Sequence, residues 1–223
     1  MASNHVLDLF NRLGVVIQND HFIYTSEIDG IEMHGSLYVN KDALYPYATE
    51  TSQLCHELAR RSLYTLDSRI NCVVGPEKGG IIISQWVGYW LTEMKSHTME
   101  PVISLFAEKI KNAAGNTRFV FNRGYGDLVK GKDVLLVDDV IHTGESVKKV
   151  ADLIRQHGGN VRSVGSLCNR GGKVAGDIGV PYMFSLLEIT MKSWSAKDCP
   201  LCAYNISINT QFGKGKEKVS LTT

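Results

Sequence analysis

Two adjacent carboxylates stand directly after an apolar run and just before a turn made of small and hydroxyl-bearing residues. The run Val134–Val137 ends in Asp138 and Asp139, and the turn follows at residues 142–146. Carboxylates in this position can hydrogen-bond sugar hydroxyls or hold Mg²⁺ through water, because Mg²⁺ prefers oxygen ligands and keeps much of its hydration. The alternative interpretation is a pair of acids that only cap a helix beside a strand.

The turn after the acids has the residue types of a phosphate site. Its members are His142, Thr143, Gly144, Glu145 and Ser146. Gly144 lets the backbone approach an anion without a Cβ in the way, while Thr143 and Ser146 add hydroxyl donors. A helix that starts here presents unpaired N–H groups and the positive end of its dipole to the anion.

A second glycine-rich turn follows another apolar run. After Val73 and Val74 the chain reads Gly75, Pro76, Glu77, Lys78, Gly79 and Gly80. Taken alone, this is an ordinary strand-to-helix turn.

Hydrophobic periodicity predicts the elements that position these turns. Short β-branched runs, typical of buried parallel strands, occur at Ile70–Val74, Val134–Val137, Val161–Leu167 and Tyr182–Ile189. Helical spacing occurs at Val6–Leu13, Thr49–Leu66 and Val147–Ile154, the last ended by Gly158 and Gly159. The alternation predicts an α/β fold with a mainly parallel central sheet flanked by helices. The polar stretch from Lys109 to Lys130 is interpreted as a functional loop, with a solvated loop or hairpin as the alternative.

Composition excludes several partner classes. The 223 residues carry 24 Lys and Arg against 23 Asp and Glu, a net charge of +1, which argues against a nucleic-acid or membrane surface and favours a small-molecule ligand. We find no secretory signal pattern and no apolar run long enough for a bilayer. Five scattered cysteines fit a reducing compartment, so a cytoplasmic protein is expected.

The thirteen residues from Val134 to Ser146 resemble the phosphoribosyl pyrophosphate signature of type I phosphoribosyltransferases, with His142 the one unusual member. The turn Gly75–Gly80 resembles the pyrophosphate loop of the orotate branch. The resemblance implies three parts: a helix and base-site hood at residues 1–45, a transferase core at 46–195 and a tail at 196–223. It assigns phosphoribosyl pyrophosphate to Gly75, Pro76, Glu77, Lys78, Gly79, Asp138, Asp139, His142, Thr143, Gly144, Glu145 and Ser146.

The resemblance extends to the catalytic loop and the base site. Leu105–Lys109 resembles the start of the family's mobile catalytic loop, so Lys109 and Lys111 are expected to neutralise the departing pyrophosphate. Cys168–Gly171 resembles the strand end whose arginine faces orotate, and the guanidinium of Arg170 suits a carboxylate-bearing base.

Two positions depart from the family pattern near the base. Thr25 stands where the family usually has a basic residue, and Lys41 is a candidate to restore that charge. The second departure is His142, which replaces a smaller residue that lies near the base in relatives. His142, Thr25 and Lys41 therefore join Arg170 as predicted base contacts.

The resemblance implies an Mg²⁺-dependent enzyme that transfers phosphoribose to orotate, with Asp138 and Asp139 holding the metal through water. It also implies a homodimer, because in relatives the loop of one subunit covers the site of its neighbour. The alternatives are a phosphoribosyltransferase for a purine or another base, and a non-catalytic regulator that senses phosphoribosyl pyrophosphate. Cys199 and Cys202 supply only two of the four ligands of a zinc site, and no nearby His or Cys pair is found to complete it. A metal shared between subunits and a redox role are the alternatives for this pair.

Overall fold

The chain packs as two compact units. The computed structural model describes residues 3–25, 31–66, 69–95, 100–111 and 117–215. One unit comprises residues 48–189, and the other joins residues 2–47 to residues 190–223. The N-terminal segment and the C-terminal tail therefore belong to the same unit. In the described part of the chain, no helix combines the length and the apolar character needed to cross a membrane.

The first unit is built on a six-stranded sheet. Its strands are β3 (Cys72–Pro76), β4 (Ile103–Lys111), β5 (Thr117–Val120), β6 (Asp133–Ile141), β7 (Asn160–Asn169) and β8 (Met183–Glu188). Their order across the sheet is β5-β4-β3-β6-β7-β8. Only the β4–β5 pair is antiparallel. The prediction of a mainly parallel sheet flanked by helices is confirmed.

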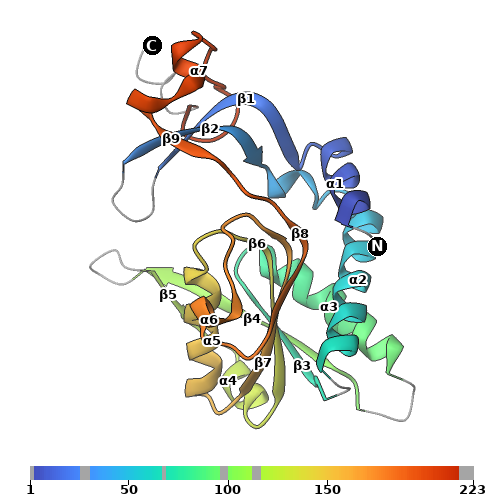
Figure 1. Cartoon of the computed structure of the whole chain (residues 1–223). Helices are drawn as coiled ribbons and strands as arrows, with labels where there is room; N and C mark the ends of the chain where they lie inside the picture. The colour runs from blue at the N-terminus through green and yellow to red at the C-terminus, as the bar shows by residue number, and fades with distance from the viewer. Residues whose placement is uncertain (1–2, 26–30, 67–68, 96–99, 112–116, 216–223) are drawn as a thin grey trace. The chain divides into compact units, whose positions relative to one another are not determined.

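Helices lie on both faces of this sheet (Figure 1). They are α2 (Ala48–Leu66), α3 (Gly79–Met94), α4 (Tyr125–Val129), α5 (Glu145–Gln156) and α6 (Ala175–Ile178). The face of α5 predicted from sequence is buried, and Val147, Val150 and Ile154 pack in one apolar cluster with Val134 and Leu136 of β6. Burial of these side chains is what holds the start of α5 beside the end of β6.

The second unit is a small three-stranded sheet with short helices. It contains α1 (Ser3–Arg12), β1 (Val16–Thr25), β2 (Glu32–Val39), β9 (Ser193–Ser195), α7 (Pro200–Ala203) and two 3-10 helices at Lys41–Ala43 and Ala196–Asp198. The sheet order is β1-β2-β9, and both pairings are antiparallel. As predicted, α1 buries Val6 and Phe10 and ends just before Gly14, which has a left-handed φ of +69°.

The stretch from Lys109 to Lys130 is more regular than its composition predicted. Residues 108–111 of β4 pair with residues 117–120 of β5, and we call this pair the β4–β5 arm. The helix α4 follows, so this stretch forms the hairpin that was given as the alternative, and its functional role stays a prediction. In β4, Ile110 alternates with the exposed Lys109 and Lys111, and β5 contributes Phe119, which is only 6% exposed. Residues 112–116 lie outside the described part of the chain.

Candidate active site

The two turns predicted to bind phosphates follow neighbouring strands at the point where the sheet divides. The strands β3 and β6 pair with each other as far as Val74 and Leu136. Beyond it, β3 continues with β4 and β6 continues with β7. The chain leaves β3 toward one edge of the sheet and β6 toward the other. In open α/β sheets, the carboxyl ends of the strands at such a division are where ligands bind.

The first turn depends on close contact between two glycines. A Cβ on Gly75 would lie 2.0 Å from the carbonyl oxygen of Gly80, so no larger residue fits this turn. The Glu77 N–H donates to the carbonyl of Ala107 (2.9 Å), and the Glu77 carboxylate accepts from the backbone N–H of Lys109 (2.8 Å). Lys78 is exposed and directly precedes α3. The turn is therefore joined to the base of the β4–β5 arm and presents an ammonium group beside a helix N-terminus.

The second turn begins with two buried acids. Asp138 is 8% exposed and Asp139 is 2% exposed. As neighbours on a strand they point to opposite faces of the sheet. The Oδ1 atom of Asp138 accepts the N–H of Asp139 (2.9 Å), and the Oδ1 atom of Asp139 accepts the N–H of Val140 (2.6 Å). These bonds give each carboxylate a fixed orientation at the end of β6.

The turn then passes into α5 through a glycine with left-handed geometry. Gly144 has φ +77°, and a Cβ there would lie 2.5 Å from Cδ1 of Ile178. Thr143 Oγ1 lies 3.4 Å from the N–H of Glu145 and accepts a weak hydrogen bond from it. His142 and Glu145 are exposed, and Glu145 forms an ion pair with Lys149. The first N–H groups of α5 therefore lie at the predicted phosphate turn.

Arg170 is brought to this turn by backbone contacts. Its N–H donates to the carbonyl of Ile141 (2.9 Å). A Cβ on Gly171 would lie only 1.7 Å from the carbonyl oxygen of His142, so the two loops touch backbone to backbone. The side-chain Nε of Arg170 is buried and has no hydrogen-bond partner among the described residues. A buried guanidinium N–H of this kind is a donor suited to a ligand acceptor.

The remaining predicted residues lie in other places. Lys109 and Lys111 are exposed on one face of the β4–β5 arm, since they are two residues apart in β4. Thr25 is the last residue of β1, and Lys41 is the first residue of a 3-10 helix. Both belong to the second unit, so their contact with the base stays a prediction.

The thiol nearest to Arg170 in sequence is not a candidate nucleophile. Burial raises the pKa of Cys168 to about 12, although the Arg170 charge acts in the opposite direction. At neutral pH this thiol therefore stays protonated, and the thiolate is the reactive form of cysteine.

Comparison with known proteins gives the same class as the fold and the two turns. A family model described as the phosphoribosyl transferase domain matches residues 48–197. A solved orotate phosphoribosyltransferase from Aeropyrum pernix superposes with a TM-score of 0.60 at 20% identity, covering 82% of this chain and 93% of that one. The first unit is thus a phosphoribosyl transferase domain.

Relatives extend the similarity to almost the whole chain. An orotate phosphoribosyltransferase from Caldanaerobacter subterraneus subsp. tengcongensis is 32% identical over 93% of this chain and 96% of its own length. The protein of the same name from Thermotoga maritima is 34% identical over 94% of this chain and 98% of its own. The chain therefore belongs to the orotate phosphoribosyltransferase family.

Proposed function

We propose that this protein transfers the 5-phosphoribosyl group of phosphoribosyl pyrophosphate to orotate, giving orotidine 5'-monophosphate and pyrophosphate in pyrimidine biosynthesis. The observation that carries the proposal is the placement of two phosphate-type turns at the division of the sheet, with the Arg170 loop packed against one of them. The names of the relatives support orotate as the base.

The two turns divide the phosphates of the substrate between them. The pyrophosphate binds at Gly75, Pro76, Glu77, Lys78 and Gly79, where Lys78 and the start of α3 supply positive charge. The 5-phosphate binds at residues 142–146, where Thr143 and Ser146 donate hydroxyls and α5 presents its first N–H groups. Helix N-termini bind anions through these unpaired N–H groups and through the helix dipole.

Asp138 and Asp139 serve the ribose between the two turns. Carboxylate oxygens are the hard donors that Mg²⁺ prefers, so this pair fits the metal that the family resemblance implies. When bound through water, Mg²⁺ neutralises charge on the pyrophosphate. The acids themselves accept hydrogen bonds from the ribose hydroxyls and orient the anomeric carbon toward the base.

The base binds beside Arg170, whose buried Nε lacks a protein acceptor in the described structure. A guanidinium pairs with the orotate carboxylate through charge-assisted hydrogen bonds. Thr25, Lys41 and His142 are the further candidates around the base.

Lys109 and Lys111 on the β4–β5 arm neutralise the leaving pyrophosphate, and the arm excludes water from the site. No covalent enzyme intermediate is needed.

A base panel tests the proposal. The protein is mixed with phosphoribosyl pyrophosphate, Mg²⁺ and one base at a time, and pyrophosphate release is measured. We expect release with orotate and little with adenine, guanine, hypoxanthine or uracil. Release with a purine alone would replace orotate by that base, a relevant outcome because an adenine phosphoribosyltransferase from Thermoanaerobacter pseudethanolicus shares the fold with a TM-score of 0.50 at 17% identity. Tight binding of phosphoribosyl pyrophosphate without pyrophosphate release for any base would favour the alternative of a non-catalytic regulator.

Arg170→Ala tests the base contact separately from the phosphate contacts. We expect orotate affinity to fall on the order of tenfold to a hundredfold, since charge-assisted hydrogen bonds contribute about 1.5–3 kcal/mol. Affinity for phosphoribosyl pyrophosphate should stay within about twofold. Titration calorimetry with each ligand measures both values. Equal loss of both ligands would show that Arg170 is structural, and unchanged orotate binding would remove it from the base site.

A further inference from the structure

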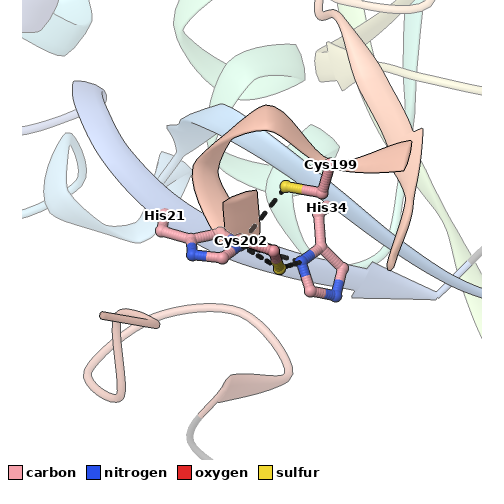
Figure 2. A group of neighbouring side chains, drawn as sticks. All are labelled: His21, His34, Cys199 and Cys202. Atoms are coloured by element: carbon pink, nitrogen blue, oxygen red, sulfur yellow. Dashed lines mark hydrogen bonds between the residues drawn. The ribbon is translucent and has the colours of Figure 1, made fainter. Parts of the chain in front are cut away.

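Four metal-ligating side chains of the second unit point toward one another (Figure 2). His21 comes from β1 and His34 from β2, Cys199 directly precedes α7, and Cys202 lies within α7. The four candidate ligand atoms all lie within 4.8 Å of one another. We propose that these residues, called here the Cys₂His₂ cluster, bind one structural Zn²⁺ ion.

The cluster corrects the conclusion drawn from sequence. In the sequence, the Cys-x-x-Cys pair lacks two ligands because the two histidines lie far from it along the chain. His21 is 178 residues from Cys199 along the chain, yet its Nε2 lies 3.7 Å from the Sγ of that cysteine. Antiparallel pairing of β1 with β2 places His34 beside His21, although the two residues are thirteen positions apart in sequence.

Three nitrogen–sulfur distances in the cluster match a tetrahedral ion. Usual zinc–sulfur and zinc–nitrogen bond lengths place neighbouring ligand atoms roughly 3.3–3.8 Å apart. Cys202 Sγ lies 3.8 Å from His21 Nε2 and 3.3 Å from His34 Nδ1. The two imidazole nitrogens, at 2.8 Å, are closer than in a zinc site and need to separate by about half an ångström.

The outer nitrogens of both imidazoles face acceptors. His21 Nδ1 lies 2.7 Å from the carbonyl oxygen of Ile206, and His34 Nε2 lies 3.1 Å from the carboxylate of Glu32. Neither acceptor can donate a proton in its usual state, so both outer nitrogens carry hydrogen. In neutral rings, the inner nitrogens then present two lone pairs to each other. A cation between them removes this repulsion, and such outer hydrogen bonds are the usual support of histidines that bind metal.

Charge and burial favour a closed zinc site. His21, His34 and Cys199 are each at most 2% exposed, and Cys202 is half-buried. Two thiolates and two neutral imidazoles balance the charge of one divalent ion, which reduces the cost of burying it. Four protein ligands fill a tetrahedral shell and leave no position for substrate, as in structural rather than catalytic zinc sites.

The ion would join the two ends of the chain within this unit. The C-terminal segment already contacts β1, since the Asn209 N–H donates to the carbonyl of His21 (2.7 Å) and the Lys214 N–H donates to that of Ile23 (3.0 Å). The sheet here has only three strands, and small units with little core are commonly stabilised by a metal. This role is independent of the proposed transfer reaction.

Metal content of the full chain tests the site. The untagged protein is purified without chelator, and its metals are measured by mass spectrometry in the absence of Mg²⁺ and phosphoribosyl pyrophosphate. We expect about one Zn²⁺ per chain and near-complete loss in Cys199→Ala. Cys55→Ala, the same change at a buried cysteine of α2, is the matched control and should keep the ion.

Cobalt substitution gives a readout that does not depend on a variant folding. Zinc is removed from the wild-type protein with a chelator and replaced by Co²⁺. Visible absorption bands of tetrahedral cobalt with thiolate charge transfer are expected, together with recovery of the thermal midpoint lost on chelation. Protein purified without metal that also gives no cobalt spectrum would overturn the proposal, as would equal metal loss in Cys199→Ala and Cys55→Ala.

Discussion

Asp138 and Asp139 are almost fully buried, although carboxylates are costly to remove from water. Each is compensated in part by a backbone N–H at the end of β6. Neither is required by the apolar core, which ends at Val137 and resumes at Ile141. Their positions are therefore better explained by the proposed ribose and metal contacts than by stability.

The Asp138→Asn, Asp139→Asn double variant tests this explanation. Asparagine keeps an oxygen that can accept the same backbone N–H, so the fold should be retained and the thermal midpoint should change little. Turnover should fall by at least about a thousandfold, because the ribose and metal contacts lose their charge. Pyrophosphate release and circular dichroism measure the two effects. Near-normal turnover in the double variant would remove both acids from the site.

At the scale of elements, the site depends on backbone packing between loops. Gly75 and Gly80 touch within one turn, and Gly171 touches His142 between two loops. The side chain of Asn169 holds the second contact, since its Nδ2 donates to the carbonyl of Lys173 (2.9 Å). These contacts place Arg170 beside the turn at residues 142–146, and its side-chain Nε has no hydrogen-bond partner in the described part of the chain.

Gly171→Ala should therefore impair the site more than an ordinary glycine substitution. The added Cβ meets the carbonyl oxygen of His142, and relieving such an overlap costs about 1–3 kcal/mol. We expect kcat/KM to fall at least about tenfold. Gly176→Ala in α6 is the matched control, because a Cβ there meets nothing within 4 Å. Equal activity of the two variants would show that the loop contact is dispensable.

In α2, a buried glutamate pairs with two partly exposed arginines, one of which also bonds to the sheet. Glu57 is 3% exposed and accepts hydrogen bonds from Arg60 (2.8 Å) and Arg61 (3.0 Å). Arg61 also donates to the carbonyl of Ser185 in β8 (3.0 Å). Burial alone raises the pKa of Glu57, but the hydrogen bonds outweigh it and lower the pKa from 4.5 to about 2.

The stability that Glu57 contributes should therefore depend on pH. Because its pKa is lower in the folded state, this stability is fully present above about pH 4.5 and is lost as the pH falls toward 2. Glu57→Gln should lower the free energy of unfolding by roughly 1.5–3 kcal/mol at pH 7. Denaturant titrations of both proteins at pH 7, 4 and 3 should show the difference shrinking. A difference that is constant with pH would contradict the ion-pair explanation.

Elements with strong periodicity were predictable, and those that depend on distant pairing were not. The helices α2 and α5 and the strand β6 match their expected ranges within a few residues. The helices carry apolar side chains at helical spacing, and β6 contains a continuous apolar run. The β4–β5 arm was predicted only as an alternative, because its second strand has only four residues. The contiguous phosphate turns were visible in sequence, whereas His21 and His34 join the cysteines only through strand pairing and the return of the tail.

At the scale of the whole molecule, α3 carries an apolar stripe that a second copy can cover. Ile82 is 37% exposed and Tyr89 is 47% exposed, and Trp86 lies between them in helical spacing. The rings of Trp86 and Tyr89 are 6.0 Å apart. We expect this surface to pair with the same surface of a second copy, which would give the twofold homodimer that the family resemblance implies.

Subunit mixing tests whether such a dimer shares its sites. One chain carries Lys109→Ala and Lys111→Ala, and the other carries Asp138→Asn and Asp139→Asn, so each homodimer is inactive. If the β4–β5 arm of one subunit covers its neighbour's site, a mixed dimer has one site with intact acids and intact lysines. Random pairing makes half of the dimers mixed, so co-expressed chains should recover about a quarter of wild-type pyrophosphate release.

Adding Ile82→Asp and Tyr89→Asp to both chains should abolish the recovery by separating the subunits. Mixed dimers that form but stay inactive would show that each arm serves its own subunit, and a fully active monomer would contradict the dimer itself.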